Sequence, residues 1–183
     1  MPCFGTRPDD RRAAGELWVH RFHRGADTVC GRGQFEICRG STIAARLLAG
    51  LLRLPKSGSA VPVAVRIDRA GHGISVWTRT FDRRRVVSRQ YRAGGRMIEW
   101  IGSVELVFRE TVAAEQIGYE QLGTRVRLFG RSVPLPAGAC PHIRAVARAC
   151  GQSRFRVAVT VALPRGEPLL TYSGCLEEEA SRW

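Results

Sequence analysis

Apolar residues near the start of the chain recur at the spacing of a helix face. A first helix is predicted over 11–24, begun by Asp10 and ended by Gly25. A second is predicted over 41–54, where Ser41 is a residue type that begins helices. Its apolar positions form one stripe, which predicts that the helix packs on the rest of the protein through that face. The stripe consists of Ile43, Leu47, Leu48, Leu51 and Leu52.

From residue 61 onward apolar and polar residues alternate, which is the pattern of strands with one buried face. A weaker alternation over 30–38 predicts a short strand between the two helices, and the less regular stretch 117–129 indicates two short strands. Gly94–Gly95 is the clearest hairpin turn. The later alternating stretches are 61–68, 74–82, 86–92, 97–103, 104–112, 117–129, 143–150, 155–163 and 169–176.

This order of elements predicts an α+β protein that is mostly β. The N-terminal helices would pack on a long curved antiparallel sheet, or on a barrel-like meander, of eight or nine strands with no parallel βαβ unit. We find no internal repeat and no linker. The expected organisation is a disordered leader over 1–10, a single domain over 11–177 and an acidic tail over 178–183.

Composition adds a large positive charge to this picture. The 183 residues hold 29 basic and 16 acidic side chains, a formal net charge of +13. All the basic residues except Lys56 are arginines, and they are scattered along the chain rather than gathered in one stripe. This distribution favours a solvated basic surface, and nucleic-acid binding is the weaker interpretation. No apolar run is long enough for a membrane span, and no signal peptide is recognisable, so we expect a cytoplasmic protein.

The cysteines and histidines give no sign of a metal site. None of the six cysteines forms a C-x-x-C pair or has zinc-site spacing, so all are expected to be reduced thiols. His20 and His23 would share a helix face, but no third ligand lies near them in the sequence. We therefore expect an exposed His20, a packed or capping His23, and no metal or other cofactor.

Candidate chemistry concentrates in the segment around Trp77. The motifs of common hydrolases, nucleotide-binding proteins, zinc proteases and kinases are absent. In a strand, Trp77, Arg79 and Phe81 point to one face, and an arginine between two aromatic rings is unusual in an ordinary core. Such a guanidinium can stack on the rings or bind an anion, whereas on an outer face it would simply reach solvent.

The turns suggest which other residues join this face. A two-residue turn at Gly94–Gly95 places Gln90 opposite Glu99. A second two-residue turn, at Arg83–Arg84, would place Arg79 opposite Ser88 and leave Glu99 diagonally within its reach. We therefore predict a ligand-binding cluster that faces the interior, the alternative being a solvated ladder on the outside. The cluster consists of Trp77, Arg79, Phe81, Ser88, Gln90 and Glu99.

Short motifs spread over residues 20–177 resemble a bacterial family, the domain of unknown function DUF4166. The likeness implies a stand-alone domain that also occurs fused to reductase-like or small membrane domains, with no established activity and no known catalytic residues. Its first segment holds His23, Gly31, Gly33, Arg39-Gly40, Ala45-Arg46 and Leu54-Pro55. Its second holds Trp77, Arg79, Phe81, Ser88, Glu99 and Gly102. Its third holds Gly130, Pro134-Leu135-Pro136, Phe155, Val157, Leu163-Pro164, Tyr172, Gly174 and Leu176.

Three functions remain open from the sequence. The favoured one is a non-enzymatic binding module that holds a small apolar or amphipathic molecule in a cavity of the sheet. The second is an enzyme that uses the same cavity, with Glu99 as base beside Arg79. The third is an arginine-rich binder of anionic surfaces or nucleic acid, whose affinity would fall steeply with salt. Catalytic residues are unknown in all three.

Overall fold

The structure is a computed structural model that describes residues 17–25, 28–52, 54–70 and 73–179. The expected leader over 1–10 lies outside the described residues, as do Cys3, the first part of the helix expected over 11–24 and most of the tail. The helices are α2 (Trp18–Arg24), α3 (Ile43–Leu51) and the short 3-10 helix η1 (Ala137–Ala139). The strands are β1 (Val29–Arg39), β2 (Gly58–Ala70), β3 (Ile74–Phe81), β4 (Arg84–Ala93), β5 (Arg96–Ile101), β6 (Val104–Ala113), β7 (Gln116–Leu128), β8 (Arg131–Pro134), β9 (His142–Ala149), β10 (Arg154–Ala162) and β11 (Pro168–Glu178).

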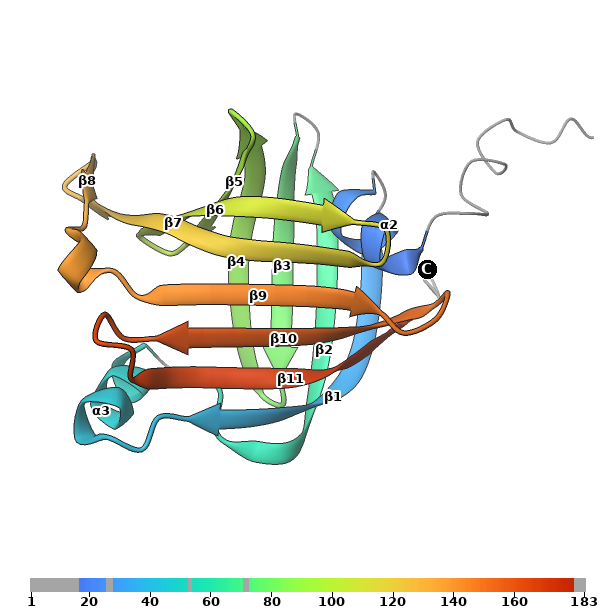
Figure 1. Cartoon of the computed structure of the whole chain (residues 1–183), viewed down its shortest axis with the longest axis horizontal. Helices are drawn as coiled ribbons and strands as arrows, with labels where there is room; N and C mark the ends of the chain where they lie inside the picture. The colour runs from blue at the N-terminus through green and yellow to red at the C-terminus, as the bar shows by residue number, and fades with distance from the viewer. Residues whose placement is uncertain (1–16, 26–27, 53, 71–72, 180–183) are drawn as a thin grey trace, which may run out of the picture.

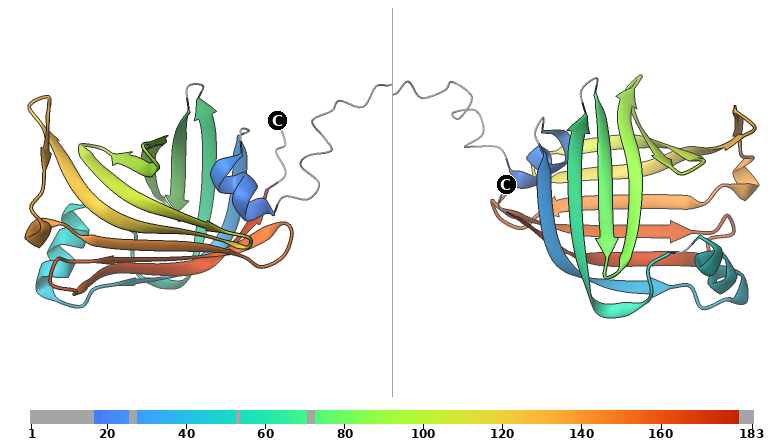
Figure 2. Two further views of the ribbon diagram at one scale, coloured as in Figure 1. Left: turned by 45° about the horizontal axis from the view of Figure 1, so that its top comes forward. Right: turned by 180° about the vertical axis from the view of Figure 1, so that it is seen from behind.

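Ten of these strands close into an antiparallel barrel. Every neighbouring pair is antiparallel, in the order β6-β5-β4-β3-β2-β1-β11-β10-β9-β7, and β6 pairs with β7 to close the ring. The short β8 pairs only with β7. In Figure 1 the strands β2 to β5 cross behind β7, β9, β10 and β11 at a steep angle, and Figure 2 shows β1 bending from one layer into the other. The described residues therefore form a mostly β fold, as predicted.

The described residues form eleven strands, more than the predicted eight or nine, although β7 is one strand where two were predicted. Opposite β6, Val107 pairs with Gly123 and Phe108 pairs with Gln121, so Leu122 is an extra residue in β7. A bulge of this kind shifts the alternation by one position, and the sequence then reads as two short strands. The count is higher because β1, expected as a short strand between the helices, joins the sheet, and because β8 lies outside the stretches predicted as strands.

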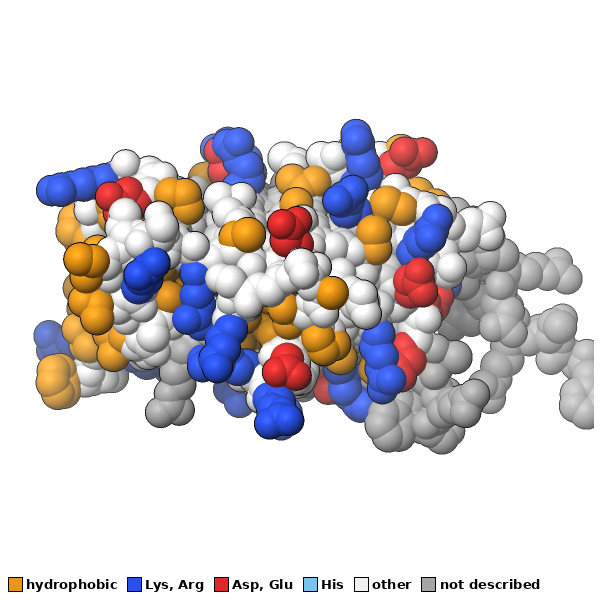
Figure 3. All heavy atoms as spheres, turned by 90° about the horizontal axis from the view of Figure 1, so that it is seen from below, with side chains coloured by type: hydrophobic (Ala, Val, Ile, Leu, Met, Phe, Trp, Pro, Cys, Tyr) orange, Lys and Arg blue, Asp and Glu red, His pale blue; other side chains and the backbone are white. Residues whose placement is uncertain are grey.

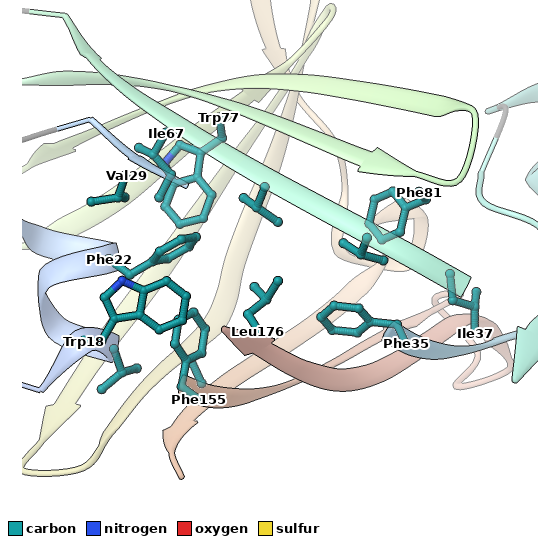
Figure 4. Packing of buried hydrophobic residues seen from close by; sticks show 14 of the residues in the cluster. Trp18, Phe22, Val29, Phe35, Ile37, Ile67, Trp77, Phe81, Phe155 and Leu176 are labelled. Atoms are coloured by element: carbon teal, nitrogen blue, oxygen red, sulfur yellow. The ribbon is translucent and has the colours of Figure 1, made fainter. Parts of the chain in front are cut away.

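The helix α2 closes one end of the barrel with its apolar side. Trp18 and Phe22 are buried, and their rings contact each other and Phe155 of β10 (Figure 4). In the last turn of this short helix, the carbonyl of Phe22 accepts a hydrogen bond of 2.6 Å from Arg69. A cation at the C-terminus of a helix satisfies carbonyls that have no partner within it.

The helix α3 turns its apolar stripe away from the barrel, whereas the stripe was predicted to pack on the protein. Thr42, not Ser41, begins it, since the Thr42 side chain accepts a hydrogen bond from the Ala45 backbone. Ala45 and Ala49 face the barrel and are fully buried, whereas four of the five stripe residues are exposed and the fifth, Leu48, is partly buried. The small residues lie inward because the backbone before the helix is tight: a Cβ on Gly40 would lie 1.9 Å from the Pro168 carbonyl oxygen. The exposed residues are Ile43, Leu47, Leu51 and Leu52.

The predictions about His20, the C-terminal segment and metal sites can also be compared with the structure. His20 is half-buried, not exposed, because its Nε2 lies 2.9 Å from the Ala114 carbonyl oxygen. Glu178 still belongs to β11 and forms an ion pair with Arg21, so the strand continues into the predicted tail. Among the described residues, five cysteines are free thiols and no group of three His, Cys, Asp or Glu side chains could hold a metal. None of the described helices has the length and apolar character needed to cross a membrane.

Candidate functional site

The barrel holds a partly open cavity of about 240 Å³ between α2 and the crossed strands. Its walls are mostly apolar, with aromatic side chains from both layers, among them Phe35, Trp77 and Phe108. The volume corresponds to about eight water molecules of the liquid and lies just below the lower end of the usual range for small-molecule pockets. The cavity can therefore hold one small molecule.

The strands β3, β4 and β5 bring the predicted polar cluster to the wall of this cavity. The Gly94–Gly95 turn has the predicted register, with Gln90 opposite Glu99. The turn between β3 and β4 does not, because it lies at Asp82–Arg83 and pairs Phe81 with Arg84. Asp82 adopts a positive φ of 53°, a conformation that Asp tolerates better than most residues.

This corrected turn moves β4 by two positions along β3. Arg79 lies opposite Val86 instead of Ser88, and Trp77 lies opposite Ser88 instead of Gln90. Side chains on a strand alternate with a period of two, so a shift of two leaves every residue on its predicted face. The predicted cluster therefore still points inward, and all its members except Ser88 line the cavity directly.

Arg79 is the centre of the cluster. Its Nη1 donates a hydrogen bond of 2.8 Å to Ser88 Oγ and one of 2.9 Å to Glu99 Oε1, so the predicted diagonal ion pair is present. The guanidinium also lies over the Trp77 ring, 4.8 Å from its centroid. Both hydrogen-bond partners of Arg79 are buried, Ser88 at 1% exposure and Glu99 at 7%, so neither lies on the outer surface.

Part of the Arg79 guanidinium faces the cavity without a partner. The side chain is 18% exposed, and this surface borders the cavity. Its Nε and Nη2 donate no hydrogen bond to any described residue. Burial acts to lower the pKa of Arg79, but the charge and hydrogen bond of Glu99, together with Tyr172 and Tyr119, outweigh burial and raise the pKa above its usual value. The arginine thus stays a cation that can still donate hydrogen bonds into the cavity.

Tyr172 lies on the opposite layer and was not predicted as a site residue. It comes from β11, lines the same cavity and contacts Phe81 ring to ring at 5.6 Å between centroids. Burial raises the pKa of its hydroxyl, so Tyr172 stays neutral, and that hydroxyl forms no hydrogen bond with a described residue. In the sequence, Tyr172 stood out only as part of the third segment of the family resemblance. The turns near Trp77 determine which strands pair locally and cannot place a residue of the distant strand β11.

His23 closes the α2 end of the cavity. Its Nδ1 donates a hydrogen bond of 2.8 Å to the Val19 carbonyl, and its ring lies against Phe22, Trp77 and Phe155. Burial lowers the pKa of His23 to about 4, so the ring is neutral at physiological pH. The prediction of a packed His23 is confirmed.

A second cluster of polar side chains, Arg92, Glu110 and Tyr119, lies beside His23 and fixes the position of Tyr119 in the cavity wall. Glu110 accepts two hydrogen bonds from Arg92, at 2.7 and 2.9 Å, and one from the Tyr119 hydroxyl at 3.1 Å. Burial acts to raise the pKa of Glu110, but the hydrogen bonds and charge of Arg92, together with the Tyr119 hydroxyl, outweigh burial and lower the pKa. These partners satisfy one another, so this group positions Tyr119 and offers no free charge to a ligand.

The described neighbours of Ser88 do not include the base that would activate its hydroxyl as a nucleophile. Glu99 is bound to Arg79, and Ser88 Oγ accepts a hydrogen bond from the same arginine. Among the described residues, no histidine is hydrogen-bonded to Ser88. An activated nucleophile needs such a neighbouring base.

On the face shown in Figure 3, the described arginines do not form one continuous basic patch. Several outer arginines are in ion pairs, such as Arg66 with Asp68 and Arg21 with Glu178. On the face shown in Figure 3, arginines and acidic residues alternate with apolar side chains. Nucleic-acid binding therefore gains no support from this view.

Comparisons with known proteins give a family and little else. A family model described as a domain of unknown function, DUF4166, matches residues 17–176. No curated protein matches the chain. A solved structure of a thioesterase II candidate from Thermobifida fusca YX is 9% identical, covers 89% of this chain and 85% of that chain, and has a TM-score of 0.28. A similarity this weak supports no conclusion about function, which has to be argued from the geometry of this chain.

Proposed function

This chain belongs to the DUF4166 family, and we propose that its barrel is a non-enzymatic binding module for one small, neutral amphipathic molecule. The apolar part of the ligand lies against the aromatic walls. Its polar end accepts hydrogen bonds from Arg79. The observation that carries the proposal is a largely buried guanidinium at the wall of a mostly apolar cavity, with two nitrogens that donate no hydrogen bond to a described residue.

The charges at the cavity wall favour a ligand without a net charge. Glu99 balances Arg79, Tyr172 is neutral, and burial keeps His23 uncharged. A carboxylate brought into this site would be a buried charge without a counter-ion of its own, which is costly. A hydroxyl, carbonyl or ester oxygen accepts hydrogen bonds from Arg79 and Tyr172 without that cost.

The first experiment identifies what the cavity holds. The purified protein is extracted with organic solvent and the extract is analysed by mass spectrometry. The expected result is a small neutral amphipathic compound, present in wild type and depleted in Arg79→Met. Conversion of such a compound by the protein would instead support the enzymatic alternative with Glu99 and Arg79.

The second experiment tests the charge argument with a matched pair of ligands, 1-decanol and decanoate. Both have a ten-carbon chain, and they differ in the charge of the head. Wild type should bind decanol at least tenfold more tightly in calorimetric titrations. Glu99→Gln keeps the shape of the side chain but leaves Arg79 unbalanced, so this variant should reverse the preference. If neither compound binds, or if the preference is the same in both proteins, the proposal is wrong.

A further inference from the structure

The outward side of α3 is an apolar surface that the fold does not use. Ile43, Leu47 and Leu51 are between 70% and 80% exposed, and Leu52 is 52% exposed. We call these four residues the α3 ridge. Apolar residues at helical spacing normally face a core, so their exposure on consecutive turns indicates a surface that is covered by something else.

A second exposed apolar point lies at the same end of the molecule. The hairpin between β7 and β8 carries Phe129, which is fully exposed, with Leu128 beside it at 52%. In both Figure 1 and Figure 2 this hairpin and α3 occupy the end opposite to α2. Figure 3 shows apolar side chains gathered at that end.

The charges around these apolar residues are mostly positive, with one acidic exception, Glu167, whose carboxylate accepts a hydrogen bond of 3.3 Å from Thr42 at the start of α3. The sequence has no Asp or Glu between residues 39 and 57 or between residues 121 and 149, which together include α3 and the β7–β8 hairpin. Arg46, Lys56 and Arg131 are exposed and form no ion pair with a described residue. Apolar side chains flanked by unpaired cations are the pattern of a surface that binds anionic lipid.

We propose that the α3 ridge, together with the tip of the β7–β8 hairpin, docks this protein on an anionic lipid bilayer. The apolar side chains insert into the boundary between headgroups and acyl chains, and the cations contact lipid phosphates. The short helix lies on the bilayer and does not cross it.

A second copy of the chain fits this surface less well. A nine-residue helix is about 14 Å long and about 10 Å wide. Its outward side is therefore far smaller than the roughly 800 Å² per partner of a stable protein interface. The formal net charge of +13 also opposes self-association and favours an anionic surface.

The position of α3 connects such docking to the cavity. Leu54 and Pro55, just beyond the helix, line the cavity. Arg39 holds them in place, donating hydrogen bonds to the Leu54 carbonyl and, at 2.6 Å, to the Pro55 carbonyl. A bilayer against α3 would therefore lie next to the wall of the proposed ligand site.

The test measures sedimentation with lipid vesicles. Wild-type protein is mixed with vesicles of phosphatidylcholine alone or with 30% phosphatidylglycerol, at low and high salt. We expect binding to the anionic vesicles that weakens with salt. The double substitution Leu47→Glu with Leu51→Glu should reduce the partition coefficient at least tenfold, and Phe129→Glu should reduce it severalfold.

A matched control carries the same change in charge on another part of the surface. Ile74 and Val112 are also exposed apolar residues, at 39% and 46%, and they lie outside α3 and the hairpin. The double variant Ile74→Glu with Val112→Glu should retain most of the binding. Equal loss in both double variants, or no binding by wild type, would overturn the proposal. So would a wild-type dimer, seen by light scattering, that the α3 substitutions dissociate.

The docking proposal can fail independently of the proposed ligand site. Arg79→Met changes the cavity and leaves the outer surface intact, so it should bind vesicles like wild type. Vesicle binding without any cavity ligand would support docking alone, and a cavity ligand without vesicle binding would support the binding module alone.

Discussion

Arg79 and Glu99 form a buried pair in which each charge depends on the other. Substituting Arg79 with alanine would leave the Glu99 carboxylate buried without its partner. We expect Arg79→Ala to lower the free energy of unfolding by about 3 kcal/mol, measured by urea denaturation. The double variant Arg79→Met with Glu99→Gln removes both charges and should recover much of that loss. Unchanged stability of Arg79→Ala would show that water reaches the pair freely.

His23 predicts how stability depends on pH. Its pKa of about 4 in the folded protein lies below the usual 6.5, so the unfolded chain takes up a proton more readily. The contribution of His23 to stability is therefore present above pH 6.5 and is lost as the pH falls towards 4.

The measurement compares wild type with His23→Phe, which keeps an aromatic ring among Phe22, Trp77 and Phe155. Between pH 7 and pH 4.5, wild type should lose about 2 kcal/mol more than the variant. Carboxylates titrate in both proteins, so only the difference is assigned to His23. Parallel pH profiles would contradict a neutral, buried His23.

For individual residues, the sequence correctly predicted which side chains of the cluster share a face, but not the register between β3 and β4. The period of two put Trp77, Arg79 and Phe81 together, and the two glycines placed Glu99 correctly. The turn was missed because the prediction centred it on Arg83–Arg84, although Asp82 tolerates a positive φ better than arginine does. Tyr172 could not be placed, since only closure of the barrel brings β11 opposite β3.

Among the elements, α3 shows where hydrophobic patterning stops being informative. Its stripe predicted which residues share a face, but not whether that face would point inward. The direction follows from the close backbone contact between Gly40 and Pro168, because Ala45 lies against Gly40 there and only a small side chain fits, while Ala49 packs in the same cluster with Leu169. A contact between residues so distant in sequence has no local signal.

The strand β7 shows a related limit. Its single extra residue, Leu122, exchanges the inward and outward positions halfway along the strand. Periodicity analysis assumes that one face stays buried throughout, so a bulge looks like a break. The regular strands without such an insertion, β3 and β10 among them, were predicted within a few residues of their observed ends.

On the scale of the whole molecule, closure depends on the pairing of β1 with β11. Gly33 of β1 lies so close to β11 that a Cβ atom there would be 1.8 Å from the Cys175 carbonyl oxygen. Because that neighbour is backbone, Gly33→Ala must push the two strands apart. We expect faster amide exchange in β1 and β11 of this variant, with β3 and β4 little changed, as measured by hydrogen–deuterium exchange and mass spectrometry. A uniform change over all strands would contradict this local opening.

The same pairing has a consequence for how the protein is made. Strand β1 is synthesised early and can pair with β2 soon afterwards. Its other edge pairs with β11, where Phe35 lies opposite Gly174, and that residue is synthesised 139 residues later (174 minus 35). During translation one side of β1 is therefore an uncovered strand edge beside a growing apolar sheet. Uncovered edges recruit other chains. The newly made protein is thus most prone to aggregate just before its last strand leaves the ribosome, and a chaperone that shields β1 during that interval would raise the yield of folded protein.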